Sequence, residues 1–520
     1  MGIAYYPYTI LVGTVITLIL WSHVSKKRSG LGRLPLPPGP KGYPLVGSFF
    51  DMPRERPWLE YDKWGKVYGD MVYFKVLGQG YLILGSNTRV NDILEKRSAN
   101  YSDRTSMPML LDLMGWDFNM TFLPYGPKWR RHRRAFHKHF HGGAVGKYQP
   151  VQFKETHAFL RRLLTAPEDF MHHVQHASGA TIMDIVYGIK VSEKGDPYLA
   201  KAEQALQGIS EAGMLGHILV DLLPFLKRVP NWMPGAGFKR RAAFWKSVNM
   251  DMVEKPFARV EESLREGNAA PSLAASLIEA LPSERNDRRA EEEQLAKDIT
   301  AVAYIGGADT TVSAVQFFFL AMAMYPDVQR KGQAEIDAVI GSSRLPGYGD
   351  RSSLPYINGI VKETMRWQLV SPLGFGHMCS NDDEYNGYLI PKGTLVLGNA
   401  WTILHDPKTY PSPDEFQPER WLKDGQIDPD IQDPTVAAFG FGRRICPGRY
   451  FSDNSMYIMI ALVLSVYNIR PPVDDQGNPV NLKPEPTSGL LSFPAPFKCS
   501  IKPRSQAAEN LIREERVVLD

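Results

Sequence analysis

The stretch from Phe439 to Gly448, FGFGRRICPG, constrains this chain more than any other. Its cysteine, Cys446, is one of three in 520 residues. The neighbouring glycines permit tight turns, which can aim backbone N–H groups at a sulfur, and the two arginines add positive charge. A buried thiolate needs both kinds of compensation. The stretch therefore indicates a thiolate metal ligand, with a buried inert cysteine as the alternative.

The other two cysteines, Cys379 and Cys499, lie far from Cys446 in the sequence. An odd number of scattered cysteines argues against a disulfide framework and for a reducing compartment. Without a second cysteine nearby, the ligand patterns of zinc and iron–sulfur sites fail. A lone thiolate that faces a large flat cofactor is the interpretation that remains.

The spacing of this stretch resembles the ligand loop of the cytochrome P450 haem-thiolate monooxygenases. The matching positions are Phe439, Gly442, Arg444, Cys446 and Gly448. The resemblance implies that Cys446 is the axial ligand of the iron of haem b (iron protoporphyrin IX) and that Arg444 faces a propionate. It also implies that Phe439 shields the sulfur and that Gly448 lets the next helix approach the ring.

A long helical segment, from about Glu291 to Tyr325, contains GGADTTVS. Adjacent glycines and β-branched residues disfavour a helix, so we expect a local opening there. The resemblance implies that Asp309 and Thr310 are catalytic and deliver the protons that cleavage of the O–O bond requires. The alternative is that the Thr310 hydroxyl merely bonds back to the preceding turn.

Three more residues are candidates for cofactor binding. Trp129 and Arg133 are four apart and share one helical face, and Arg133 can bind a carboxylate through its planar fork. The resemblance implies that this pair holds a haem propionate. His377 is assigned to the haem as well, although Gly376 stands where the family commonly has proline.

Glu363 and Arg366 are three apart and share a helical face. Glu262 and Arg265 have the same spacing, and there a solvated surface pair is the natural interpretation. The resemblance selects Glu363 and Arg366, together with Arg420, as a buried structural network that supports the haem loop.

The segment around Trp129 is also rich in cations and histidines. Its further cations are Arg130, Arg131, Arg134 and Lys138. They form either a solvated face or a docking surface for an acidic redox partner. Its histidines are His132, His137, His139 and His141. No pattern of carboxylate ligands accompanies them, so we expect no metal site there.

The N-terminus carries a candidate membrane anchor. Residues 1–25 contain no Lys, Arg, Asp or Glu, and the mostly apolar run from Ile3 to Trp21 is long enough to span a bilayer as a helix. Three cations follow at once, Lys26, Lys27 and Arg28. The distribution of charge predicts a single-pass helix with the body in the cytosol, and a buried core helix is the alternative.

The expected organisation is an anchor at 1–25, a basic and proline-rich linker at 26–42, a catalytic domain at 43–500 and a polar tail at 501–520. The prolines favour a stiff, extended spacer. The stretch 71–86 predicts a hairpin. The resemblance implies the P450 fold, which is mainly α, with a large helical lobe and a small β lobe.

The resemblance, in its fungal microsomal form, implies a monooxygenase of the endoplasmic reticulum membrane. Its substrates would be lipophilic small molecules, such as secondary metabolites, polycyclic aromatics, terpenoids or steroids. The chain shows no flavin or nicotinamide fingerprint, so NADPH–cytochrome P450 reductase is the implied electron donor. The net charge of +4 is too small to suggest a nucleic-acid partner.

Four segments are candidates for the walls of the substrate site, namely 106–122, 303–308, 370–375 and 488–493. Their Met and aromatic side chains suit a bulky ligand, but they also suit ordinary core packing. Two rival functions stay open. One is an isomerase or dehydratase of the same fold that uses no dioxygen, and the other is a non-catalytic haem carrier or sensor.

Overall fold

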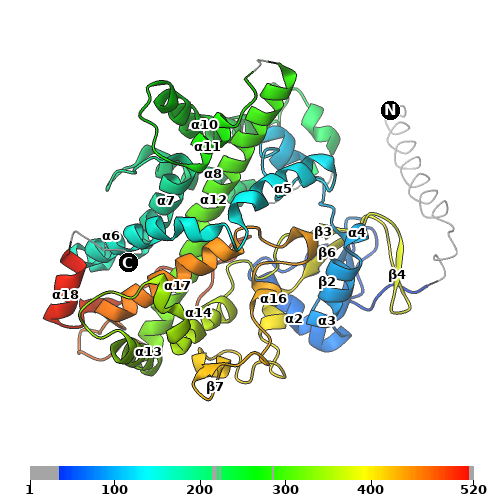
Figure 1. Cartoon of the computed structure of the whole chain (residues 1–520). Coiled ribbons are helices and arrows are strands. Elements are labelled where there is room, and N and C mark those ends of the chain that lie inside the picture. Colours follow the sequence, from blue (N-terminus) through cyan, green and yellow to red (C-terminus); the bar gives the residue numbers. More distant parts are fainter. Residues whose placement is uncertain (1–33, 213–219, 222–223, 284–285, 515–520) are drawn as a thin grey trace, which may run out of the picture.

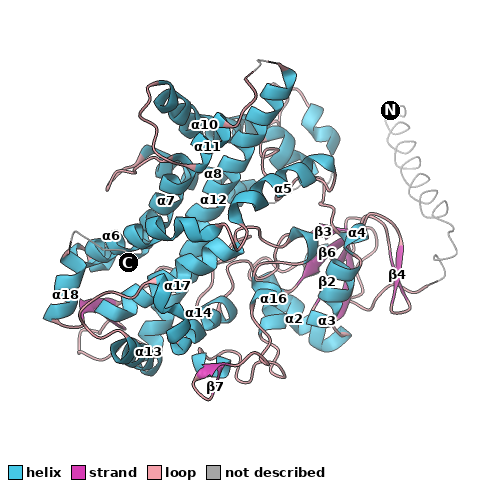
Figure 2. Ribbon diagram, viewed as in Figure 1, coloured by secondary structure: helices cyan, strands magenta, loops and turns pink. Residues whose placement is uncertain are grey.

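A computed structural model describes residues 34–212, 220–221, 224–283 and 286–514. The fold is mostly helical, and the small sheet that contains β2, β3 and β6 lies on the side opposite α6 and α18 (Figures 1 and 2). The predicted anchor at 1–25 and the first part of the predicted linker lie outside the described residues.

The longer helices are α2 (Pro57–Tyr68), α5 (Pro127–Phe140), α6 (Gln149–Thr165), α7 (Phe170–Tyr187), α8 (Pro197–Ala212), α10 (Gly237–Arg265), α12 (Asp287–Met324), α13 (Pro326–Val339), α14 (Pro355–Trp367), α17 (Arg449–Val466) and α18 (Gln506–Arg513). Shorter helical turns that matter below are η4 (Met109–Leu113), η8 (Tyr348–Ser353), α16 (Thr435–Ala438) and η10 (Gly442–Arg444). The longer strands and those near the site are β1 (Met71–Val76), β2 (Gln79–Leu84), β3 (His377–Met378), β5 (Tyr388–Ile390), β6 (Leu395–Gly398), β9 (Tyr467–Arg470) and β10 (Ser500–Pro503).

Helix α12 runs through the middle of the helical lobe. The side chain of Asn286 caps its N-terminus by accepting a hydrogen bond from the N–H of Arg289 at 3.1 Å. The helix ends at Met324 because Pro326 cannot continue it, and Pro326 instead begins α13. Within the described residues α12 alone is long and apolar enough to cross a membrane, but 78% of its most apolar window is buried, which identifies a core helix.

Two hydrophobic clusters meet along α12. Its C-terminal half packs with residues of α6, α14 and α17, and its N-terminal half packs with residues of α5, α7, α10 and η4. A third cluster fills the β lobe. Near the junction of the first two clusters, α12 approaches α17, where the hydroxyls of Thr311 and Ser452 lie 3.1 Å apart.

The main sheet has the strand order β1-β2-β6-β3. Strands β1 and β2 form the predicted hairpin, with Met71 opposite Leu84. Strand β2 pairs in parallel with β6, so the helices from α5 to α14 lie between these neighbours in the sequence. Strand β3, which carries His377, pairs antiparallel with β6.

Part of the proline-rich segment is docked on the β lobe. The carbonyl of Pro38 accepts a hydrogen bond from the N–H of Tyr73 at 2.9 Å, and that of Pro35 accepts one from Leu389 at 2.8 Å. A Cβ on Gly39 would lie 1.9 Å from the Tyr73 carbonyl oxygen. The segment therefore lies against β5 at residue 35 and tightly against β1 at residues 38 and 39.

The expectation of a polar tail at 501–520 is wrong for residues 501–513. Strand β10 pairs with β9, and α18 packs against α6 and α17. The reason lies in the spacing of Ala508, Leu511 and Ile512, which form one buried apolar face, while polar residues cover the other. The side chain of Ser505 caps this helix.

Candidate cofactor-binding and active site

The Cys446 loop links α16 to α17. Gly442 has a φ of +58°, and a Cβ on it would lie 2.0 Å from the carbonyl oxygen of Leu94. Only glycine fits this position, because it combines left-handed backbone with close approach. The N–H of Cys446 donates to the carbonyl of Phe439 at 2.8 Å, which closes the turn. The loop is thus shaped by backbone contacts.

The Cys446 thiol lies in a setting with opposing electrostatic effects. Burial raises its pKa, while a hydrogen bond with the Gly448 backbone and the cations of Arg133 and Arg449 lower it. Donors and cations of this kind favour a thiolate once a metal cation is bound, since a coordinating thiol is deprotonated.

Arg444 and Trp129 are in direct contact. The Arg444 guanidinium lies 4.5 Å from the centre of the Trp129 ring. It donates to three backbone carbonyls, of Ser102 at 2.8 Å, Met120 at 3.2 Å and Leu123 at 2.9 Å. Burial lowers the pKa of Arg444 to about 10. Arg444 therefore ties the Cys446 loop to the segment 102–123.

His377 is buried beside this contact. Its Nδ1 lies 2.7 Å from the carbonyl oxygen of Tyr101, and because a carbonyl only accepts, Nδ1 carries the hydrogen. Burial lowers the pKa of His377 to about 3, and the charges of Arg104 and Arg444 add to this effect. The imidazole is therefore neutral at physiological pH.

Arg104 is a functional candidate that the sequence analysis missed. It is buried and donates to the carbonyls of Thr121 at 3.0 Å and of Phe375 and Gly376 at 2.7 Å. Burial, then the charge of Arg444, lowers its pKa to about 9. The available signal was an isolated arginine directly before the apolar segment 106–122.

Together these residues form a cluster with excess positive charge. Arg104, Arg133 and Arg444 are all largely buried, and none of them forms a salt bridge with a described carboxylate. Asp103 is the one carboxylate whose charge acts on Arg104 and Arg444. Such a cluster suits an anionic ligand, because unpaired buried cations are costly.

Helix α12 is continuous through Gly306–Ser313, so the expected local opening is not present. The Thr310 hydroxyl donates to the carbonyl of Gly306 at 2.7 Å, which is the back-bonded alternative. Gly307 lets α7 pack closely, since a Cβ there would lie 2.8 Å from Ile182. Packing on both sides outweighs the weak helix propensity of this stretch.

Asp309 lies on the same stretch and is largely buried. Burial, then the Glu203 carboxylate on α8, raises the pKa of Asp309 to about 6. A carboxyl group with this pKa exchanges a proton near neutral pH, as a general acid does.

Glu363, Arg366 and Arg420 are brought together in one network. Arg366 binds both carboxylate oxygens of Glu363, at 2.9 and 2.8 Å, and Arg420 reaches Oε1 at 3.1 Å. Trp421 and the N–H of Gln417 also donate to this carboxylate. Glu363 and Arg366 are fully buried, and every donor of Arg366 is used, so the charges are compensated.

The histidines of α5 and His141 directly after it do not form one cluster. His132 contacts Asp298 of α12 through Nε2 at 2.8 Å and the carbonyl of Lys128 through Nδ1 at 2.8 Å. The rings of His137 and His141 lie 5.4 Å apart. Across the described residues, no three His, Cys, Asp or Glu side chains are grouped so that they could hold a metal ion.

The comparisons with known proteins agree with this geometry. The family model described as Cytochrome P450 matches residues 37–500. The chain is 48% identical over 478 residues to Cytochrome P450 monooxygenase COX2 of Coprinopsis cinerea, covering 92% of this chain and 91% of that protein. It is 43% identical over 508 residues to Cytochrome P450 monooxygenase COX1 of the same fungus, covering 97% of this chain and 98% of that protein. It is also 42% identical over 476 residues to Tryptamine 4-monooxygenase of Psilocybe cyanescens, covering 91% and 93%.

This chain belongs to the cytochrome P450 family. It is an oxidoreductase of the monooxygenase class, and a haem cofactor follows from the family. The residues present fit that group. The half-buried Cys446 lies near the cations Arg133 and Arg449, which favour a thiolate. The excess positive charge of Arg104, Arg133 and Arg444 suits the two carboxylates of a haem.

The segments expected to wall the P450 substrate site are partly joined. One cluster contains apolar residues of segment 106–122, among them Trp116, together with helix residues of 303–308 and Phe375. Val370 and Phe493 pack into the other large cluster instead. Two of the four predicted walls therefore share one apolar environment on the α12 side, while 370–375 is divided between two clusters.

Proposed function

We propose that this P450 is a membrane-anchored monooxygenase that hydroxylates lipophilic small molecules with dioxygen and electrons from NADPH–cytochrome P450 reductase. The observation that carries the proposal is the half-buried Cys446 in a glycine-shaped loop, together with the cluster of buried Arg104 and half-buried Arg133 and Arg444. A thiolate ligand favours O–O cleavage, and haem supplies the oxygen chemistry when bound.

In this proposal each site residue has a defined task toward haem b. Cys446 ligates the iron, Phe439 shields the sulfur and Gly448 lets α17 approach the ring. Five residues with largely buried side chains that can bind a carboxylate or pack beside it hold the propionates, namely Arg104, Trp129, Arg133, His377 and Arg444. Glu363, Arg366 and Arg420 support the loop from behind.

Asp309 and Thr310 are proposed to move protons. The Asp309 carboxyl, whose pKa is raised to about 6, can take a proton from water, and the Thr310 hydroxyl can pass it on. To do so, the Thr310 O–H must turn away from the Gly306 carbonyl. Thr310→Ala is expected to raise hydrogen peroxide release relative to product, and unchanged coupling would contradict this assignment.

The proposed substrates are secondary metabolites or foreign compounds, such as polycyclic aromatics, terpenoids and steroids. Support comes from the Met and aromatic side chains of the cluster that contains Trp116 and helix residues 303–308. One relative is named for 4-monooxygenation of tryptamine, so aromatic amines belong in the panel of test compounds.

We propose that residues 1–25 anchor the protein in the endoplasmic reticulum membrane, with the catalytic domain in the cytosol. The exposed side chains of Arg134 and Lys138 on α5 offer a docking surface for an acidic reductase. Arg131 contributes less free charge, because it pairs with Glu291 at 3.2 Å and Glu292 at 3.0 Å.

The deciding experiment is a spectrum of the reduced protein with carbon monoxide. We expect the Soret position that is specific to a thiolate ligand, its loss in Cys446→Ser and its retention in the control Cys499→Ser. A spectrum typical of histidine ligation in the unmutated protein would overturn the proposal. Product analysis of reductase-supplemented microsomes then identifies the substrate, and product formed without NADPH consumption would indicate an isomerase or dehydratase.

A further inference from the structure

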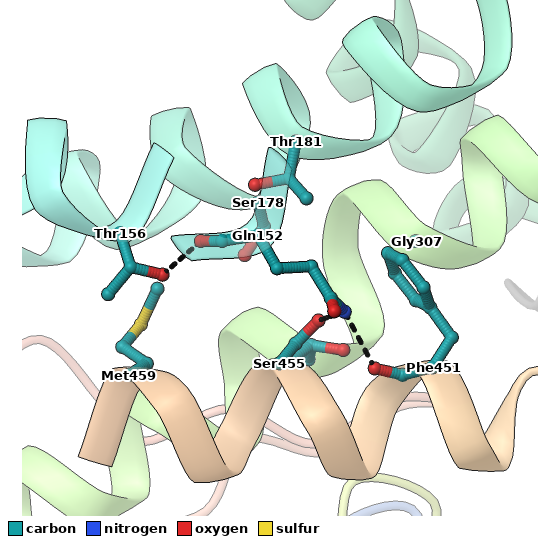
Figure 3. A pocket seen from close by; sticks show the side chains of 9 residues that line it. Gln152, Thr156, Ser178, Thr181, Gly307, Phe451, Ser455 and Met459 are labelled. Carbon is teal, nitrogen blue, oxygen red and sulfur yellow. Dashed lines mark hydrogen bonds between the residues drawn. The ribbon is translucent and has the colours of Figure 1, made fainter. Parts of the chain in front are cut away.

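A small cavity lies where α6, α7, α12 and α17 meet (Figure 3). It has about 20 Å³ of space for water, which is enough for one molecule. Six of its nine lining residues carry a polar side chain. The lining residues are Gln152, Thr156, Ser178, Thr181, Gly307, Thr311, Phe451, Ser455 and Met459.

The hydroxyl groups around the cavity have unused hydrogen-bonding capacity. Thr156 and Thr181 donate to the carbonyls of Gln152 and Ala177, both at 2.7 Å, so their oxygens can still accept. Ser455 accepts from Gln152 Nε2 at 2.7 Å, and its own O–H has no acceptor among the described residues.

The frame of the cavity is held firmly. Gln152 Nε2 also donates to the Phe451 carbonyl at 3.1 Å, and its Oε1 accepts from the Tyr348 hydroxyl at 3.0 Å. Figure 3 shows Gln152 bridging to Ser455 and Phe451 on α17. With its amide fully used, Gln152 fixes the wall and leaves the cavity centre to the hydroxyl groups.

The cavity touches the stretch of α12 that matters for catalysis. Gly307 and Thr311 are four apart and share one helical face, next to the face of Gly306 and Thr310. The Thr311 hydroxyl lies 3.1 Å from that of Ser452 on α17. The cavity and this contact therefore join α12 to the helix that begins directly after the Cys446 loop.

We propose that the cavity holds one resident water molecule that bridges Thr181 of α7 to Ser455 of α17. We further infer that this water and Thr311 hold the α12 turn that carries Asp309 and Thr310, so that Thr311 is a positioning residue. A polar cavity with two acceptors and a free donor binds water, whereas cavities that stay dry are apolar. The second inference rests on the proposed oxygen chemistry, and the first does not.

The water is tested by a high-resolution crystal structure of the haem-loaded protein. We expect one peak of density within hydrogen-bond distance of the Thr181 and Ser455 hydroxyls. An empty cavity would overturn the proposal. In Ser455→Ala the peak should weaken or disappear, because the hydroxyl proposed to donate to the water is gone.

The positioning role is tested by Thr311→Val, with Thr300→Val as the matched control. Thr300 is a buried threonine of the same helix that bonds back to Ala296 at 2.9 Å and does not line the cavity. We expect backbone amide exchange at residues 306–313 to rise about twofold to tenfold in Thr311→Val, the range set by one net hydrogen bond. We expect Thr300→Val to leave that segment unchanged.

The second readout is the share of NADPH electrons that leaves as hydrogen peroxide in reductase-supplemented membranes. It should rise in Thr311→Val while the carbon monoxide spectrum stays normal. Unchanged exchange and unchanged peroxide in Thr311→Val would refute the positioning role. Loss of the thiolate spectrum in the unmutated protein would instead refute the proposed function. If Thr311→Val does not fold, Ser455→Ala provides the same measurements.

Discussion

The two sides of the site are built in different ways. The cofactor side, around Cys446, is held by backbone: a glycine pressed on the Leu94 carbonyl and a turn closed by the Phe439 carbonyl. The opposite side, around Thr310, is held by side chains, with one hydroxyl bonded to its own helix and a polar cavity next to it. We therefore expect substitutions on the first side to destabilise the fold more than substitutions on the second.

The largest expected effect on stability comes from the buried network of Glu363, Arg366 and Arg420. Glu363→Gln removes the charge that compensates buried Arg366 and Arg420, which should cost about 3–5 kcal/mol in the free energy of unfolding. The matched control is Glu262→Gln. The exposed Glu262 carboxylate pairs with Arg259 and not with the Arg265 considered in the sequence analysis, and we expect little or no loss of stability. Denaturant titration measures both, and equal losses would show that the buried network has no special weight.

The glycines of the loop provide the next comparison. Gly440→Ala and Gly442→Ala both place a Cβ on left-handed backbone, which costs about 1–2 kcal/mol. Gly442→Ala should cost about 1–3 kcal/mol more, because its Cβ also meets the Leu94 carbonyl, whereas Gly440 has open space. Thermal unfolding and haem content of the two variants check this order, and a reversed order would contradict the packing described.

The cationic cluster can be tested through the release of haem. Arg104→Gln should remove about 1.5–3 kcal/mol of charge-assisted bonding, so haem should leave about 10 to 100 times faster. Arg134→Gln, on the exposed face of α5, is the control and should change nothing. Transfer of haem to excess apomyoglobin gives the rates, and equal rates in both variants would exclude Arg104 from the cofactor site.

The smallest effect is a dependence of stability on pH. Burial raises the folded-state pKa of Asp309 to about 6, above its ordinary 3.8, so the folded protein holds this proton more tightly than the unfolded chain. The contribution of Asp309 to stability therefore falls as the pH rises from about 4 to about 6. Asp309→Asn should gain stability relative to the unmutated protein across this window. The measurement is the free energy of unfolding of both proteins as a function of pH, and two parallel curves would contradict the raised pKa of Asp309.

Sequence reasoning succeeded where a local pattern determines structure. The helix predicted from about Glu291 to Tyr325 corresponds to the greater part of α12, which ends before Pro326, and the hairpin predicted at 71–86 is β1–β2. The match of the family model confirms the family that the loop around Cys446 indicated.

The features that sequence reasoning missed depend on distant contacts. Arg104 matters because the chain folds Arg444 against it, from a position more than 300 residues later. The α12 stretch stays helical because α7 packs on Gly307, which overrides its weak propensity. The sequence predicts a polar tail where helix α18 lies, because only three residues of this helix, Ala508, Leu511 and Ile512, form its buried apolar face.

Arg444 has a mechanical consequence. Its guanidinium is bonded to the carbonyls at Ser102, Met120 and Leu123, the two ends of the segment that encloses Trp116. Asn249 also bonds to this segment, at the Met114 carbonyl, but Arg444 is the side chain that couples it to the cofactor loop. A substitution that shifts the loop is therefore expected to shift the segment 102–123 as well, so that substrate preference and cofactor fit change together.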